Sequence, residues 1–168
     1  MYGYQFHNMQ IAAEKNGWTK FSTLQNHYNL VYREDERDLI PVAQQYGVSL
    51  IPYSPLAGGH LARTQWFSDS KRSETDFTLK RKYDHAKEND MQIIARVAEV
   101  AEKRGAAMTD VALGWLFKKG VAAPIVGATK ISHFDAAVHA LDFTVSDEEA
   151  AYLEELYRAH DVVGAIKP

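Results

Sequence analysis

The feature that most limits the fold of this chain is the alternation of short apolar segments with amphipathic helical segments. Three apolar segments, 21–24, 48–53 and 122–126, are short enough for strands and are bounded by polar residues or glycine. Helical periodicity fills the stretches around them. Strands that are separated by helices pair in parallel through right-handed crossovers. The sequence therefore predicts an α/β fold with about three parallel strands and flanking helices.

Apolar residues recur at helical spacing in six segments, and local end signals accompany several of them. Gly47 and Gly105 stand where a left-handed residue ends a helix, and Asn89 and Ser146 begin sequences typical of a capping box. The predicted helices cover 4–15, 33–46, 89–105, 109–119, 132–141 and 146–156. The apolar stripe predicted for the first of them consists of Phe6, Met9, Ala12 and Ala13.

Two stretches carry no clear period. Residues 62–89 have few apolar positions and are predicted to form a long loop. Residues 161–168 are predicted to form a tail. Both belong to a single domain that spans residues 1–168.

The composition excludes several classes of protein. The 168 residues, 46% of them hydrophobic, suffice for one globular domain. Lysine and arginine number 19 against 22 aspartates and glutamates, so no basic field would attract nucleic acid or anionic lipid. The absence of cysteine excludes disulfides and thiolate chemistry. No signal peptide or membrane span is apparent, so we expect a cytoplasmic protein with a small-molecule ligand.

A parallel sheet of three strands is incomplete by itself. Both of its faces need cover, and both of its edges carry unpaired backbone groups. We therefore expect either a homo-oligomer, most simply a dimer, or a second polypeptide that completes the sheet.

Four side chains are candidates for acid–base chemistry because they follow predicted strand ends. These are His27, Tyr28, Tyr53 and His60. The competing interpretation is that the histidines are exposed loop residues and that Tyr53 packs in the core. The seven histidines form no HExxH motif and no compact set with carboxylates, so no metal site is predicted.

Five motifs, in this order along the chain, resemble the aldo-keto reductase superfamily and in particular its aryl-alcohol dehydrogenase-like branch. They are LQNHYNL at 24–30, YREDER at 32–37, IPYSPLAGGHL at 51–61, TDVALGWL at 109–116 and APIVGA at 123–128. Members of that superfamily are (β/α)₈ barrels, which need about 250 residues. The resemblance therefore implies a partial TIM barrel that corresponds to the C-terminal portion, strands six to eight.

The resemblance also implies part of an NADP site at the carboxyl ends of the strands. Gln25 matches the glutamine that hydrogen-bonds the nicotinamide carboxamide, and Tyr53 matches the aromatic residue that stacks on the nicotinamide ring. Ser54, Leu56 and Gly58 match the loop that follows the pyrophosphate. Read from the residues alone, Gln25 is also a plausible polar cap of a strand, and Gly58 with Gly59 is first of all a turn.

The adenosine end of the site is implied at the start of the helix after the third strand. Gly127, Thr129, Lys130 and His133 lie where the family holds the adenosine 2′-phosphate. The match departs from the pattern of tight NADP binders, which have a Lys or Ser after the strand, then an Arg and a Glu-Asn pair. Lys130 is the cation that this sequence offers instead.

The family activity is NADP-dependent reduction of aldehydes and ketones. The resemblance places the catalytic Asp, Tyr, Lys and His before the first matched motif, so we expect a truncated relative without intrinsic hydride transfer. Two alternatives remain open. One is a non-redox enzyme of the isomerase, cyclase or lyase kind, with a pocket rebuilt at a homodimer interface. The other is a half-barrel that a separate N-terminal chain completes into a working carbonyl reductase.

Overall fold

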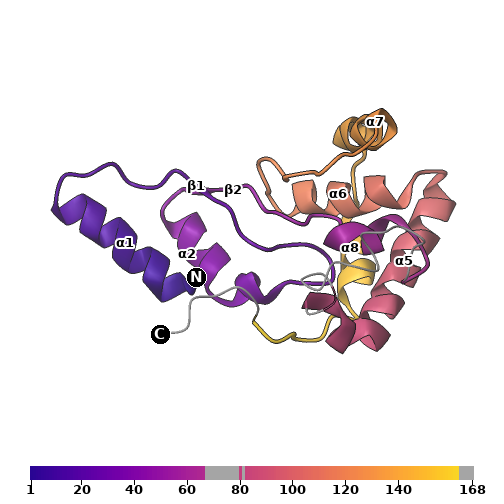
Figure 1. Ribbon diagram of the computed structural model, residues 1–168, viewed down its shortest axis with the longest axis horizontal. Coiled ribbons are helices and arrows are strands. Elements are labelled where there is room, and N and C mark those ends of the chain that lie inside the picture. The colour runs from indigo at the N-terminus through magenta and orange to yellow at the C-terminus, as the bar shows by residue number, and fades with distance from the viewer. Residues whose placement is uncertain (67–79, 81, 163–168) are drawn as a thin grey trace.

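The computed structural model describes residues 1–66, 80 and 82–162. Helices α1 and α2 and the strands lie toward one end of the molecule, and α5, α6 and α8 lie toward the other (Figure 1). The helices and strands are α1 Gly3–Lys15, β1 Thr23–Leu24, α2 Leu39–Gln45, β2 Ser49–Leu50, α5 Lys87–Arg104, α6 Met108–Lys118, α7 Ile131–His139 and α8 Asp147–Glu154. Short 3-10 turns cover Glu34–Arg37, Ala57–Ala62, Asp84–Ala86 and Ala140–Asp142.

The described residues form a mostly helical structure with a small parallel sheet, rather than a sheet of three full strands. β1 pairs with β2 in the register Thr23 to Ser49 and Leu24 to Leu50. Hydrogen bonds extend this pairing beyond the strands, because Tyr53 N donates to Asn26 O over 2.9 Å. The predicted parallel direction is therefore confirmed.

The predicted third strand at 122–126 is wrong in extent. Ala122 N donates to Leu50 O over 3.0 Å, and Ile125 N donates to Pro52 O over 2.8 Å. Only an isolated parallel bridge between Tyr53 and Ile125 results. Pro52 and Pro124 have no N–H group, so the ladder between these two segments lacks regular donors.

The helices agree with the predicted ones, with local corrections. The segment 33–46 divides into a 3-10 turn and α2, because Pro41 cannot donate the hydrogen bond that would join them. α5 begins at Lys87, before Asn89, and the Asn89 side chain donates to Leu156 O over 2.7 Å instead of capping the helix. Of the predicted loop 62–89, residues 67–79 and 81 lie outside the described part of the chain.

The stripe predicted for α1 is correct at Phe6 and Ala13 but wrong at Met9, which is 41% exposed. Gln10 is buried in its place, and its side-chain amide exchanges two hydrogen bonds with the backbone of Phe21, at 3.0 and 2.9 Å. A buried amide is tolerated here because both of its polar ends are paired.

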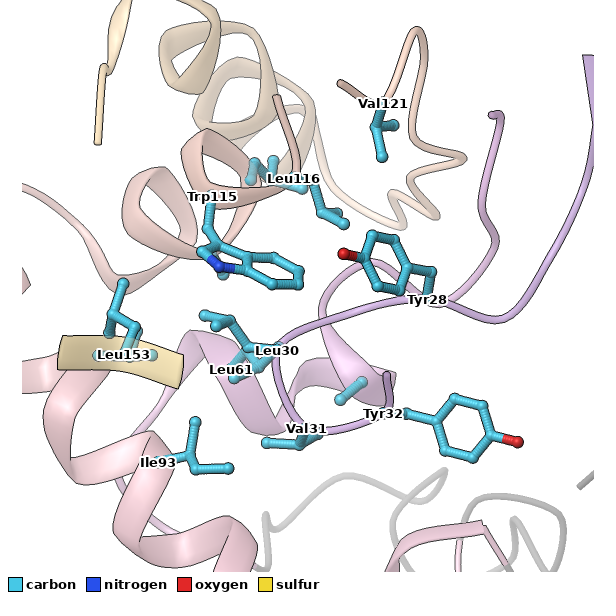
Figure 2. Packing of buried hydrophobic residues seen from close by; sticks show 14 of the residues in the cluster. Tyr28, Leu30, Val31, Tyr32, Leu61, Ile93, Trp115, Leu116, Val121 and Leu153 are labelled. Carbon is cyan, nitrogen blue, oxygen red and sulfur yellow. The ribbon is translucent and has the colours of Figure 1, made fainter. Parts of the chain in front are cut away.

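The hydrophobic core lies where α5, α6 and α8 meet the segment after β1. Trp115 of α6 is fully buried at its centre, with the ring of Tyr28 5.2 Å away (Figure 2). α5 contributes the periodic face that the sequence predicts, including Ile93, Ile94 and Val97. Because the segment after β1 packs in this core, the core positions the carboxyl end of β1. The pairing of β1 with β2 then positions the carboxyl end of β2.

One helix stays outside the core. α7 has no buried residue and lies apart from α5 and α8, beyond α6 (Figure 1). Ile131, Phe134, Val138 and Leu141 are 81%, 61%, 46% and 63% exposed. Within the described ranges, no helix has the length and apolar character needed to cross a bilayer.

Candidate functional site

A cavity of about 140 Å³ opens beside the carboxyl ends of β1 and β2. It is lined by residues at the ends of both strands, by residues between Tyr32 and the start of α2, and by Met1 and Val162. The lining residues are Met1, Leu24, Gln25, Asn26, His27, Tyr32, Asp35, Leu39, Tyr53 and Val162.

The cavity brings together Gln25 and Tyr53, the two residues for which the nicotinamide role is expected. Gln25 follows directly after β1 and is exposed, whereas Tyr53 follows β2 and is half-buried. The parallel register places them on the same edge of the sheet. The cavity lining thus includes a planar amide and an aromatic ring, the groups that suit a flat, amide-bearing ring.

His27 lies under the Tyr53 ring as part of an aromatic stack. Its ring is 5.0 Å from Tyr53 at 14° and 4.0 Å from Tyr32 at 16°. His27 Nε2 lies 2.7 Å from the hydroxyl of Tyr83, while Nδ1 has no hydrogen-bond partner among the described residues. Burial, together with the charge of Lys82, lowers the pKa of His27 to about 3. The imidazole is therefore neutral near pH 7.

The cavity also contains an acid that the sequence did not identify as functional. Asn26 Nδ2 donates to Asp35 Oδ2 over 3.0 Å, and within the described part of the chain the carbonyl oxygen of the Asn26 side chain has no hydrogen-bond partner. Burial raises the pKa of Asp35 to about 6, against the lowering effect of the Asn26 bond. A carboxyl group that titrates near neutrality can accept or release a proton at the cavity. Asp35 lies inside the motif 32–37, but no signal there marked it as different from its acidic neighbours.

The other two acid–base candidates lie outside the cavity lining. Tyr28 donates to Glu36 Oε1 over 2.5 Å, and burial and this bond raise the pKa of its phenol well above the ordinary value. His60 stacks on Trp66 at 4.0 Å, and burial lowers the pKa of its imidazole to about 4. The interpretation of His27 and His60 as exposed loop residues is wrong, since they are 5% and 4% exposed.

The loop after Tyr53 has an unusual backbone. Ser54 and Ala57 have φ angles of 54° and 49°, in the left-handed region that non-glycine residues rarely adopt. Gly58 and Gly59 follow with φ of 65° and 98°, which glycine adopts without strain. Leu56 lies within this loop, half-buried. The chain therefore leaves the extended conformation of the strand directly after Tyr53.

The residues implied for the adenosine end are all exposed, and they lie around the start of α7. Lys130 immediately precedes the helix, and Gly127, Thr129 and His133 surround it. The bridge between Tyr53 and Ile125 brings this segment next to the cavity edge. None of these four residues lines the cavity. Among the described residues, no group of three or more potential metal ligands is found.

Comparison with known proteins decides the family. Residues 3–158 match the family described as the aldo/keto reductase family. The chain belongs to this family.

Fungal proteins are similar to this aldo/keto reductase chain along almost its whole length. An aldo-keto reductase of Fusarium vanettenii is 42% identical over 98% of the chain, and a putative aryl-alcohol dehydrogenase of Schizosaccharomyces pombe is 41% identical over 97%. Versiconal hemiacetal acetate reductase of Aspergillus parasiticus is 40% identical over 94%. These matches cover 44%, 46% and 46% of the relatives' own lengths, so the chain spans about half the length of the curated relatives it matches.

The family assignment explains the small parallel sheet. Aldo/keto reductases are built as barrels of parallel strands, with sites formed at the carboxyl ends of those strands. The β1–β2 pair, the segment 122–125 and the cavity at their carboxyl ends fit a fragment of such a barrel.

Proposed function

We propose that this chain provides the nicotinamide side of the cofactor site of an NADP(H)-dependent aldehyde or ketone reductase. The observation that carries this proposal is the position of Gln25 and Tyr53 in the lining of one cavity, after the ends of two neighbouring parallel strands. The amide has a donor and an acceptor for the nicotinamide carboxamide. The Tyr53 ring stacks on His27 and has Lys82 Nζ 4.5 Å from its centroid. The nicotinamide ring is proposed to stack on Tyr53 in place of the Lys82 ammonium group, leaving the opposite face of the nicotinamide for hydride transfer.

The adenosine end of NADP(H) is proposed to lie along the loop from Ser54 to Gly58 and at the start of α7. Lys130 stands immediately before α7, where the helix N-terminus and an ammonium group both favour an anionic phosphate. Gly127, Thr129 and His133 complete this end of the proposed site. Because all of them are exposed, each is accessible to a nucleotide.

The proposed substrate is a small aldehyde or ketone, or the corresponding alcohol. The names of two relatives, a hemiacetal acetate reductase and a putative aryl-alcohol dehydrogenase, support this class. We place the family's catalytic Asp, Tyr, Lys and His outside these 168 residues, because the resemblance assigns them to the part of the relatives that this chain does not match. The chain alone is then expected to bind cofactor without transferring hydride.

The proposed partner is a polypeptide that carries the remaining strands and helices of the barrel. Two surfaces support this. The apolar stripe of α7 and of the 3-10 turn that follows it, which consists of Ile131, Phe134, Val138 and Leu141, is exposed. Within the described residues, β1 is paired on one side only, with β2. A second copy of the chain is the alternative partner. Light scattering of the purified chain distinguishes the two, because only this alternative gives a dimer of the chain alone.

A second candidate function is proton transfer on a small metabolite, without redox chemistry. Asp35 favours it, because the carboxyl faces the cavity and its pKa is raised to about 6. A proton-transfer enzyme would lose most of its turnover in the variant Asp35→Asn, which keeps the shape of the side chain but cannot exchange a proton.

NADPH binding, followed by fluorescence titration, tests the principal proposal. We expect saturable binding by the chain, weakened about tenfold in Gln25→Ala because one amide with two hydrogen bonds is lost. Gln92→Ala is the matched control, since Gln92 is exposed on α5, away from the cavity, and its loss should leave the affinity unchanged. Absence of binding, or equal affinity of the chain and its Gln25→Ala variant, contradicts the proposal.

A further inference from the structure

Tyr83 lies immediately before the 3-10 turn Asp84–Ala86, in the stretch that the sequence predicts to be a polar loop. Its side chain is nevertheless fully buried. The hydroxyl oxygen lies 2.7 Å from His27 Nε2 and accepts a hydrogen bond from Asn29 Nδ2 over 3.1 Å. Tyr83 therefore joins the segment before α5 to the residues that follow β1.

Each partner of the Tyr83 hydroxyl leads to the proposed nicotinamide platform, which we define as Tyr53 and Ser54. The His27 ring stacks on the Tyr53 ring, with centroids 5.0 Å apart. Asn29 Nδ2 donates to Ser54 O over 2.9 Å as well as to Tyr83. The amide group of Asn29 thus uses its two N–H donors to connect the Tyr83 hydroxyl to the backbone of the platform.

The platform needs such support because its backbone is strained. Ser54 has a φ of 54°, and Ala57, three residues later, has a φ of 49°. Non-glycine residues remain in this region only when their surroundings hold them there. The bond from Asn29 to Ser54 O is one such restraint, and the His27 ring beneath Tyr53 is another. Loss of the hydroxyl from Tyr83 leaves a buried imidazole nitrogen and a buried amide without their common partner.

We infer that Tyr83 is a positioning residue that sets the orientation of Tyr53 and Ser54 through His27 and Asn29. Tyr83 is absent from the cavity lining, so it acts on a bound ligand only through these neighbours. For cofactor binding the inference rests on the proposed function, because the ligand that the platform would hold is the nicotinamide ring. The orientation of the platform itself does not depend on that proposal.

The test compares the unsubstituted chain with Tyr83→Phe and with Tyr157→Phe. Tyr157 is the matched control, because its hydroxyl also has two partners, Glu34 Oε1 and Arg33 N, at 2.8 Å each, and it lies outside the platform. Amide hydrogen exchange is measured for Tyr53, whose N–H binds Asn26 O, for Ala57, whose N–H binds Ser54 O, and for Ile51, whose N–H binds Leu24 O. NADPH affinity is measured on the same three proteins.

In Tyr83→Phe we expect the Tyr53 and Ala57 amides to exchange about tenfold faster, while the Ile51 amide is unchanged. NADPH affinity should fall about tenfold in this variant. Tyr157→Phe should change neither quantity. Unchanged exchange at Tyr53 and Ala57, or equal acceleration at Ile51, overturns the inference whether or not NADPH binds. If the unsubstituted chain fails to bind NADPH, the proposed function fails, and the exchange result still decides the role of Tyr83.

Discussion

Two buried histidines and the half-buried Asp35 contribute to how the stability of the chain responds to acid. Burial lowers the pKa of His27 to about 3 and that of His60 to about 4. As the pH falls below the ordinary histidine value, the unfolded chain binds these two protons before the folded chain does, so stability is lost. Asp35 acts in the opposite direction, because its raised pKa, about 6, lets the folded chain bind a proton first.

Between about pH 6 and pH 5 the two histidines outweigh Asp35 by one proton. As the pH falls by one unit, these three groups together should lower the free energy of unfolding by about 1.4 kcal/mol. Urea unfolding at a series of pH values measures this slope. In His60→Gln, which keeps a hydrogen-bonding amide in place of the imidazole, the slope should be smaller by about 1.4 kcal/mol per pH unit. An equal slope in the two proteins would show that the fold does not lower the pKa of His60.

At the residue scale, the cavity could be predicted in part from the sequence. Gln25 and Tyr53 follow strand ends, and parallel strands bring their carboxyl ends to one edge, so their meeting follows from local patterns. Asp35 and Tyr83 could not be identified in this way. Tyr83 follows the charged residues Lys80 and Lys82, and its burial arises from contacts with residues distant in sequence, such as His27.

At the scale of elements, α6 packs against the segment around Phe143 at Gly114. A Cβ atom at this position would lie 2.8 Å from the backbone oxygen of Phe143. Alanine favours a helix over glycine by about 1 kcal/mol. We nevertheless expect Gly114→Ala to lower the free energy of unfolding by roughly 1–3 kcal/mol, because the backbone at Phe143 must move to make room for the added methyl group. The matched control is Gly127→Ala, whose Cβ would meet nothing within 4 Å. Urea unfolding of both variants checks the sign.

The start of α8 depends on its capping box. Ser146 Oγ accepts from Glu149 N over 3.1 Å, and Glu149 Oε2 accepts from Ser146 N over 2.9 Å. Ser146→Ala should cost about 1 kcal/mol of stability. Ser132→Ala serves as the control, since Ser132 is exposed within α7 and is not its N-cap. Equal thermal midpoints for the two variants would contradict a stabilising role of the cap.

The elements differ in how far the sequence could predict them. The Ser146 box and the end of α5 at Gly105 were predictable because each depends on a few neighbouring residues. The boundaries set by proline were missed, since apolar spacing continues through Pro41 and Pro124 although each removes a backbone donor. As a result, the length of the strands was predicted less well than their order and direction.

At the scale of the whole molecule, the exposed stripe of α7 should be the surface on which association depends. Phe134→Glu should leave the stability of the isolated chain unchanged within about 0.5 kcal/mol, because the side chain is already 61% exposed. The same variant should fail to bind the complementing barrel half, taken from the unmatched part of the Aspergillus parasiticus reductase. Ser132→Glu places the same charge elsewhere on α7 and should bind normally. Equal binding of both variants in calorimetry would exclude the stripe as the interface.

The central claim is that this chain supplies the cofactor side of a reductase whose catalytic residues lie elsewhere. Consumption of NADPH with an aromatic aldehyde, measured for the chain alone, for the complementing half alone and for their mixture, tests it most directly. We predict turnover in the mixture only, reduced at least about tenfold when the chain carries Tyr53→Ala. Turnover by the chain alone, or a stable mixed complex that consumes no NADPH, would contradict the claim.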